Sequence, residues 1–494
     1  MASRMNIEYQ PADPHLFNLT AKAVEEGLAR VSKLVADKKY IGTYFKFPKI
    51  SYSASGMPEF SQRLFSGGPT DYKEAFGRKD DKPVRLDQVP SFIALFDYID
   101  SAESCSRLRA YFSSTEASMP TEEAEKVSSR NDSFYQRSKD LFISGIVDRY
   151  IHLHGDAPFS LEHFAPIYLL LESGIFKETL PIDIVVPILF LQFNFERASL
   201  GTDMSIERMD EGFQLARFLQ SSDSTEVKPS VMGAATHALI LHDWEFKNRR
   251  YYEAFNTYYV FSTYPLNQIE SFFTALRIAT GASTGYAQLL MRPLGWAHSY
   301  EAHLPPVEGI SIRRYPSWFE YNDWREPTAA VTEQDALEAG NVFSKFTAVD
   351  DKRLALASRR LNLCLIRETE EDSILDATIA MEALLSDDER QEMTHKLALR
   401  MAALSGLSNE IKKTPVEVYR DVKHIYRFRS AVVHGSTKAS AKREIAVSGE
   451  EKVPTVTAAI NYLRMAIKVL IDNPKYLNPS KIDEDLLLGK QVSE

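Results

Sequence analysis

The spacing of apolar residues changes near residue 335, and this change constrains the fold more strongly than any other feature. Beyond it, apolar side chains recur every three or four residues, which is typical of helices that bury one face. This spacing predicts helices at 332–346, 350–368, 371–386, 388–406, 415–434 and 455–472. Almost no strand pattern interrupts them, so we predict an all-α helical bundle of about 130 residues, a common domain size.

The sequence before the bundle carries a mixed pattern. The predicted elements are one or two strands in 38–55, a strand or short helix in 85–104, a helix at the end of 120–154, a helix at 161–176, a buried strand opening 180–197, amphipathic helices at 205–220 and 269–281, and irregular or β structure in 305–327. The predicted fold class is therefore an α+β N-terminal region followed by an all-α C-terminal bundle.

A chain of 494 residues is too long for one hydrophobic core, so several domains are expected. We divide it into a mixed α/β region at 1–155, a second mixed α/β region at 156–335, the helical bundle at 336–480 and a tail at 481–494. The second region is a candidate sensor or regulatory part, an assignment that rests only on its size.

Composition excludes several classes of protein. The net charge of −10 argues against a surface that binds nucleic acid all over, but it permits one local basic site. The two cysteines, Cys105 and Cys364, form no CxxC pair, which excludes a zinc ribbon or a disulfide framework and favours a reducing compartment. The most apolar segment, 184–193, is shorter than the roughly 20 residues that span a membrane. We predict a cytoplasmic protein that does not enter the membrane.

The helix at 415–434 carries an arginine where an apolar residue is expected. Val418, Val422, Ile425, Tyr426, Val432 and Val433 form an apolar stripe. Arg429 occupies the missing position in that stripe. A buried guanidinium costs several kcal/mol unless it is paired or reaches an opening, so Arg429 requires a specific reason.

His434 follows five residues later, directly before Gly435, which we predict to be the glycine that ends the helix. A histidine that moves protons beside an arginine that holds an anionic phosphate is a suitable pair for cleaving a phosphodiester. The segment 416–443 contains seven basic and two acidic residues, which gives it a local charge of +5. The predicted RNA contacts are Lys423, Arg427, Lys438, Lys442 and Arg443.

A structural alternative explains the same residues. Arg429 can simply pair with a carboxylate of a neighbouring helix, and Glu382 is the candidate because it borders the apolar stripe of its own helix. In that case His434 is only a helix cap. The composition and spacing alone leave both interpretations open.

The segment resembles the HEPN superfamily, and within it the Apea-like branch, whose helical bundles carry an R-x(4–6)-H motif at the end of one helix. Here the motif reads R-SAVV-H from Arg429 to His434, followed by glycine. The upstream segment 376–406 is also similar, with an E-x-L helix and then Lys396 and Arg400 in a K-x-x-x-R step. The resemblance covers about 345–475. Where that family often has Asn, Asp or His directly after the arginine, this chain has Ser430.

The resemblance implies a metal-independent endoribonuclease without a cofactor. Arg429 would hold the scissile phosphate, His434 would act as general acid or base, and the 2′-hydroxyl of the RNA would attack. Glu382, Tyr426 and Ser430 are expected to support the site. The resemblance also implies a homodimer or higher even oligomer formed through the bundle, a toxin–antitoxin or anti-phage defence role, and an antitoxin or regulatory partner. The alternative is a dimerising RNA-binding or scaffold protein without catalysis.

Two other groups of residues were weighed as metal sites. His152, His154 and Asp156 alternate and would share one face if they lay on a strand. Glu245 and Lys247 form an E-x-K element, which occurs in metal-dependent nucleases and would need a further acid such as Asp183. Neither group supplies enough ligands, so no metal is predicted. The chain also lacks a GxxxxGK loop and a GxGxxG turn.

Overall fold

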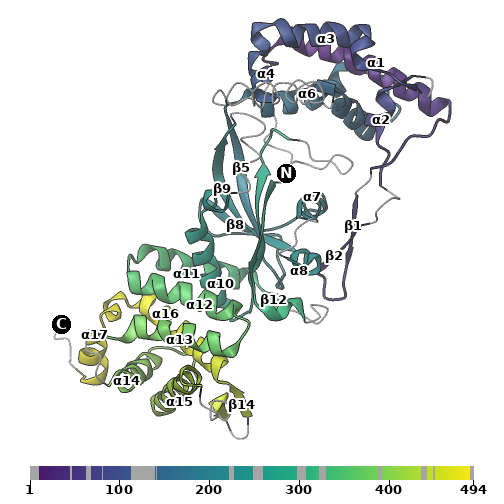
Figure 1. Cartoon of the computed structure of the whole chain (residues 1–494). Helices are drawn as coiled ribbons and strands as arrows, with labels where there is room; N and C mark the ends of the chain where they lie inside the picture. Colours follow the sequence, from purple (N-terminus) through teal and green to yellow (C-terminus); the bar gives the residue numbers. More distant parts are fainter. Residues whose placement is uncertain are drawn as a thin grey trace, which may run out of the picture.

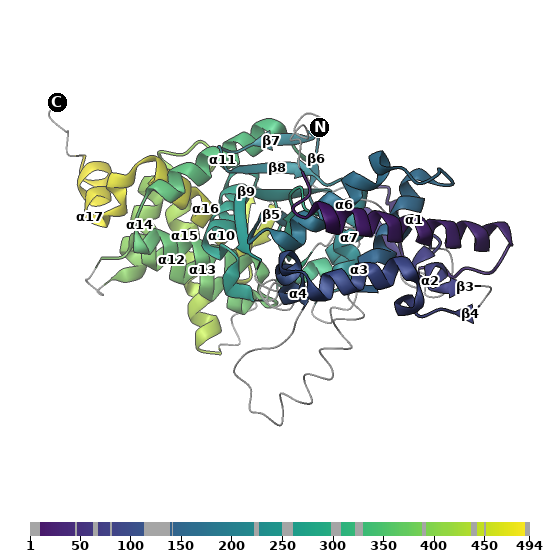
Figure 2. The ribbon, with the colours of Figure 1, turned by 90° about the horizontal axis from the view of Figure 1, so that it is seen from above.

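The computed structural model describes residues 10–44, 47–62, 68–79, 82–112, 139–140, 142–221, 227–248, 260–297, 308–321, 330–387, 392–435, 442–448 and 451–489. The chain forms an N-terminal group of helices, a central sheet with helices on both faces, and a C-terminal helical bundle (Figure 1). Seen from above, the N-terminal helices and the bundle lie on opposite sides of the sheet (Figure 2).

The N-terminal helices enclose their own hydrophobic core. They are α1 (Pro14–Ala36), α2 (Tyr72–Phe76), α3 (Pro90–Ser101), α4 (Ser106–Phe112), a helix that includes 142–154, and α6 (Leu161–Phe176). The segment 85–104, predicted as a strand or a short helix, is mainly the helix α3, and the predicted helices at the end of 120–154 and at 161–176 are confirmed. Residues 113–138 lie outside the described residues.

The strands expected in 38–55 are represented by β1 (Pro48–Tyr52), which pairs antiparallel with β2 (Pro58–Gln62). This hairpin extends from the N-terminal helices along the sheet region, as Figure 1 shows. There it contacts α7 (Glu211–Ser221) and α8 (Pro229–Gly233), and the ring of Phe60 stacks on that of Phe218 with centroids 4.4 Å apart. The hairpin therefore joins the N-terminal helices to the sheet.

The central sheet has six strands in the order β11-β10-β5-β9-β8-β7, and every pairing within it is antiparallel. Its strands are β5 (Thr179–Pro187), β7 (Arg197–Ser199), β8 (Met204–Arg208), β9 (His237–Lys247), β10 (Tyr286–Pro293) and β11 (Glu308–Arg314). A short parallel pair, β6 (Gln192–Phe193) and β12 (Ala330–Val331), lies beside it. The mixed α+β character predicted for this part of the chain is confirmed.

Alternating side chains of β5 supply two separate cores. Ile184 and Val186 face the helices α10 (Leu266–Thr280) and α11 (Glu333–Ala348). Val185 points to the opposite face, which α7 and α8 cover. Because both faces of the sheet are buried, the central strands appear in the sequence as apolar runs rather than as an alternating pattern.

One prediction for this part needs correction, and two strands were missed. The segment 205–220 is not one helix, because its first residues belong to β8 and α7 begins only at Glu211. The central strands β9 and β10 were not predicted, since apolar runs of this length do not distinguish a buried strand from a helix. By contrast, the helix ending at Gly281 is confirmed as α10, and Gly281 adopts the left-handed conformation.

The C-terminal region is helical, as predicted, and its helix boundaries agree with the predicted ones to within a few residues. After α11 come α12 (Lys352–Ile366), α13 (Glu370–Leu385), α14 (Met393–Ser405), α15 (Pro415–Val433) and α16 (Thr455–Asp472). The predicted boundary at 335/336 lies inside α11, whose first half packs on the sheet while Val342 and Phe346 belong to the core of the bundle.

The bundle region is not all-α. A hairpin of β13 (Glu444–Ser448) and β14 (Glu451–Pro454) lies between α15 and α16. Its strands are short. Ile445 is buried in the core of the bundle, and Val453 is half-buried against it. The sequence signal of this hairpin is weak because Ile445, Ala446 and Val447 form a short apolar run rather than an alternating pattern.

Part of the predicted tail also belongs to this region. Residues 474–487 form three short helical turns, η6 (Pro474–Leu477), α17 (Pro479–Ile482) and η7 (Asp483–Leu487). Ile482 is fully buried in the core of the bundle. The chain therefore remains packed against the bundle beyond residue 480.

Candidate functional site

Helix α15 carries most of the predicted site residues, and its two ends are well defined. Thr414 caps the first turn in a capping box with Glu417, and Pro415 occupies the first helical position. The helix ends at His434, and Gly435 follows with a φ of +58°. The prediction that Gly435 ends the helix is confirmed, because this conformation strains residues that have a Cβ atom.

The apolar stripe of α15 is buried over most of its length. Val418, Val422, Ile425 and Tyr426 lie in the core of the bundle, as the spacing predicts. Val432 is half-buried, but Val433 is 52% exposed because the helix ends there, beyond its neighbours. Phe428 and Ala431 are buried although they lie off the predicted stripe.

Arg429 lies half-buried on the side of α15 that packs in the bundle. Its Nε atom is buried, and within the part of the chain that the structure describes it has no hydrogen-bond acceptor. Among these same residues the guanidinium forms no ion pair. The intrachain pair between Arg429 and Glu382, which the structural alternative requires, is therefore not formed in this chain.

Glu382 interacts with Tyr426 instead. Burial, the negative charge of Glu382 and a hydrogen bond with that carboxylate hold the pKa of the Tyr426 phenol well above its usual range, while the charge of Arg429 opposes this shift. The phenol also lies 3.4 Å from the carbonyl oxygen of Thr378. Glu382, Tyr426 and Arg429 thus lie together between α13 and α15.

His434 lies on a different side of α15. Five residues of an α-helix correspond to about 140° of rotation, so His434 and Arg429 project from different faces. The backbone N–H of His434 donates to the carbonyl of Ser430 at 3.1 Å, and both residues are exposed. One chain alone does not place the imidazole and the guanidinium on one face.

The predicted RNA contacts differ in their surroundings. Lys423 is half-buried and Arg427 is exposed, and the Nζ atom of Lys442 lies 3.4 Å from the carbonyl oxygen of Arg427. Arg443 pairs with the carboxylate of Glu371 at 2.5 Å, so its charge is largely neutralised. Lys438 lies outside the described residues. The basic character of this region is thus weaker than the local charge of +5 suggests.

The two basic residues of the K-x-x-x-R step are structural. Arg400 is buried and donates to Asp387 at 2.7 Å, to Asp483 at 2.6 Å and to the carbonyl of Leu385 at 2.6 Å. The Nζ atom of Lys396 lies 3.4 Å from the carboxylate of Asp387. These contacts connect α13, α14 and the C-terminal turns.

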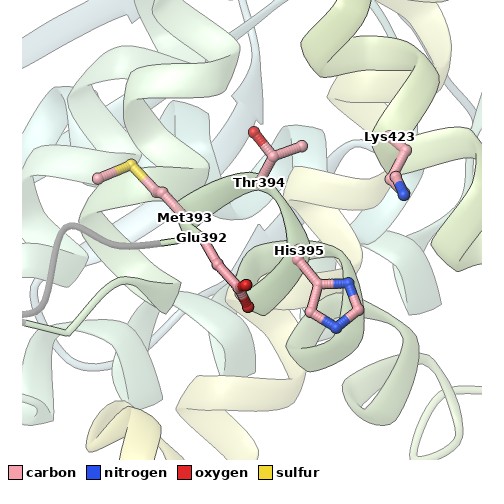
Figure 3. A pocket seen from close by; sticks show the side chains of 5 residues that line it. All are labelled: Glu392, Met393, Thr394, His395 and Lys423. Carbon is pink, nitrogen blue, oxygen red and sulfur yellow. The ribbon is translucent and has the colours of Figure 1, made fainter.

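An open cavity of about 480 Å³ lies where the first turn of α14 meets α15. It is lined by Glu392, Met393, Thr394, His395 and Lys423 (Figure 3). Of these residues the sequence reasoning identified only Lys423. The others were missed because their proximity to Lys423 depends on how two helices pack, and no short motif records that packing.

The candidate metal ligands are not assembled. His152 and His154 lie on a helix rather than a strand, and the ring of His154 stacks on that of His163 with centroids 3.9 Å apart. In the described ranges, no group of three or more His, Cys, Asp or Glu residues is placed to hold a metal ion. Asp183 does lie beside β9, but its carboxylate contacts Arg292 at 2.5 Å and His242 at 3.1 Å. It is therefore already paired and does not complete the E-x-K element.

The same contacts extend to a serine that the sequence reasoning missed. Ser205 Oγ lies 2.8 Å from His242 Nε2, so Ser205, His242 and Asp183 form a hydrogen-bonded chain like that of serine hydrolases. Ser205 is only 1% exposed, however, and its hydroxyl also donates to Glu207 at 2.8 Å. A substrate cannot reach this hydroxyl. We therefore interpret these three hydrogen-bonded side chains as a polar network that holds β5, β8 and β9 together.

Comparisons with known protein families, with curated proteins and with solved structures find no match to this chain. The HEPN resemblance therefore rests on the motif and on the order of the helices. Among the helices in the described ranges, none is both long and apolar enough to cross a membrane.

Proposed function

We propose that the protein is a metal-independent endoribonuclease of the HEPN type, with Arg429 and His434 as its catalytic residues. The observation that carries the proposal is the state of Arg429. This cation lies in a helix seam, no carboxylate among the described residues pairs with it, and a buried Nε donor is left without an acceptor. Since no carboxylate neutralises this half-buried cation, a phosphate that reaches the accessible part of its side chain is a suitable partner.

The proposed reaction uses the 2′-hydroxyl of the RNA as the nucleophile. A base removes its proton, the 2′-oxygen bonds to phosphorus, and the bond from phosphorus to the 5′-oxygen breaks while that oxygen gains a proton. His434 carries these protons and Arg429 stabilises the negative charge on the phosphate. The products are a 2′,3′-cyclic phosphate and a 5′-hydroxyl, and DNA is not cleaved because it lacks the nucleophile.

A second copy of the chain is part of the proposal. Arg429 and His434 project from different faces of α15, so a two-fold contact between bundles is a simple way to bring the arginine of one copy to the histidine of the other. The exposed Val433 beside His434 supplies apolar surface at that end of the helix. We expect a dimer, measurable by light scattering after size-exclusion chromatography.

The test is RNA cleavage in the presence of EDTA. The wild-type protein should produce fragments ending in 2′,3′-cyclic phosphate, whereas Arg429→Met and His434→Ala should lose this activity while remaining dimeric. Removal of a catalytic acid or base typically lowers the rate by about 10²–10⁴-fold. Equal cleavage by the wild type and by both variants would refute the assignment.

The alternative is a dimerising RNA-binding or scaffold protein without catalysis. It is favoured by the separation of about 140° between the two motif residues on one helix, because a single copy then holds no complete site. RNA binding without any cleavage product, in a stable dimer, would support this alternative. The cytoplasmic location, the defence role and the regulatory partner stay predictions.

A further inference from the structure

Two polar side chains that line the cavity between α14 and α15, His395 and Lys423, are linked through Tyr419, which lies beside the cavity. Lys423 Nζ donates a hydrogen bond to the hydroxyl of Tyr419 at 3.3 Å and also lies 5.2 Å from the centre of that ring. The same hydroxyl lies 2.9 Å from His395 Nδ1. Tyr419 therefore links a cation of α15 to an imidazole of α14.

These bonds show which groups are left to bind something else. The Tyr419 oxygen accepts a hydrogen bond from Lys423, and its contact with His395 uses the Nδ1 atom of that ring. Among the described residues, the remaining ammonium hydrogens of Lys423 have no acceptor and Nε2 of His395 has no hydrogen-bond partner. A ligand that only accepts hydrogen bonds and carries negative charge fits such donors.

One side chain of the cavity opposes an anion. The carboxylate of Glu392 lines the same space and is exposed, and it forms no ion pair with any described residue. Its negative charge lies in the same cavity as Lys423 and weakens the attraction for a free anion. The cavity is therefore suited to a phosphate that is held at several other points, as in a nucleic-acid backbone, rather than to a small ion alone.

The position of the cavity on α15 connects it to the motif. Lys423, Arg427, Ser430 and His434 recur at steps of four, three and four residues, so they form one stripe along the outer side of the helix. Lys423 and His434 are eleven residues apart, a rise of about 16 Å along the axis. A single strand of several nucleotides can follow this stripe from the cavity to the end of the helix.

We propose that His395, Tyr419 and Lys423 form a subsite that holds a backbone phosphate of a single-stranded nucleic acid several nucleotides away from the phosphate that is cleaved. The identity of the strand as RNA rests on the proposed function. The subsite itself contacts phosphate and does not read the 2′-hydroxyl. It is thus expected to bind single-stranded DNA of the same sequence by the same contacts.

The test measures binding of a fluorescent single-stranded DNA oligonucleotide to the full-length protein at several salt concentrations. Lys423→Gln should weaken binding and should lower the slope of log affinity against log salt by about 0.7, the value for one lost phosphate contact on a single strand. Glu392→Gln should tighten binding. Lys352→Gln removes an exposed lysine of α12 outside the cavity and serves as the matched control.

The result that overturns the subsite is equal affinity and equal salt slope for the wild type, Lys423→Gln and Lys352→Gln, or no binding by the wild type at low salt. Melting temperatures of all variants show whether each is folded. Because DNA is not a substrate, these outcomes are separate from those of the cleavage test. DNA binding that depends on Lys423, without any RNA cleavage, refutes the proposed enzyme and keeps the subsite. RNA cleavage together with DNA binding that is unaffected by Lys423→Gln refutes the subsite and keeps the enzyme.

Discussion

Two arginines of the C-terminal bundle have contrasting surroundings. Arg400 is held by Asp387 and Asp483, while Arg429 has no carboxylate partner among the described residues. This contrast suggests different roles for the two arginines, one in stability and the other in function. A paired arginine contributes to folding, and its removal leaves charges behind, whereas an unpaired one in a seam contributes little to folding and is available to a ligand.

We therefore expect Arg400→Met to destabilise the protein by about 1–3 kcal/mol, because two carboxylates and a backbone carbonyl lose their donor. Arg429→Met should leave the stability unchanged or raise it, since it removes a half-buried cation that has no partner among the described residues. Thermal melts of the two variants provide the measurement, and each is the control of the other. A large loss of stability in Arg429→Met would indicate a structural arginine and favour the scaffold alternative.

The Arg400 contacts also predict that the stability of the protein depends on pH. Hydrogen bonding to Arg400 lowers the pKa of Asp387 below its ordinary value of 3.8, despite some opposing desolvation. A carboxyl group with a lowered pKa in the folded state contributes stability above its ordinary pKa and loses that contribution as the pH falls through the lowered value. The difference in melting temperature between the wild type and Arg400→Met should accordingly shrink as the pH is lowered from 6 toward about 3. A constant difference over this range would contradict the assignment.

At the scale of one element, the end of α15 decides where His434 lies. Gly435 follows it with a φ of +58°, where an alanine costs about 1–2 kcal/mol. Gly435→Ala should lower the melting temperature and, by fraying the last turn, reduce any cleavage that depends on His434. Asparagine tolerates this backbone conformation better, so Gly435→Asn should lie closer to the wild type. Identical behaviour of both variants would show that the helix end does not position His434.

How much the sequence predicts depends on how local the information is. The helices of the bundle are predicted because caps such as Thr414 and the apolar spacing lie within single segments. The strands β9 and β10 escape prediction because a short apolar run does not by itself distinguish a buried strand from a helix. In the same way, the unusual position of Arg429 is visible in one helix, whereas the contact of His395 with Tyr419 depends on the packing of two helices.

At the scale of the whole molecule, the sheet and the bundle are joined by buried polar side chains. Asn362 of α12 accepts a hydrogen bond from Arg277 of α10 at 2.5 Å and donates to Glu270 at 2.8 Å. Thr274 of α10 lies 2.8 Å from Ser358 of α12. Burial lowers the pKa of Arg277 to about 10, and the guanidinium is held largely by amide and carbonyl oxygens. Such a network requires the two parts to keep one relative position.

This network yields a prediction about how the first part of the chain can influence the bundle. Asn362→Leu keeps the approximate size of the side chain but removes the acceptor for Arg277 and the donor for Glu270, which should cost about 1–3 kcal/mol at the contact between α10 and α12. The sheet and the bundle should then unfold in two separate calorimetric transitions, whereas in the wild type they should unfold together. Asn341→Leu, an equal change at an exposed position of α11, should leave the wild-type profile unchanged.

If the Asn362→Leu profile also matches the wild type, the two parts are not coupled through this network. If the Asn362→Leu profile shows two transitions, the network couples the sheet to the bundle. A conformational change in the sheet region is then transmitted to the helix that carries Arg429 and His434.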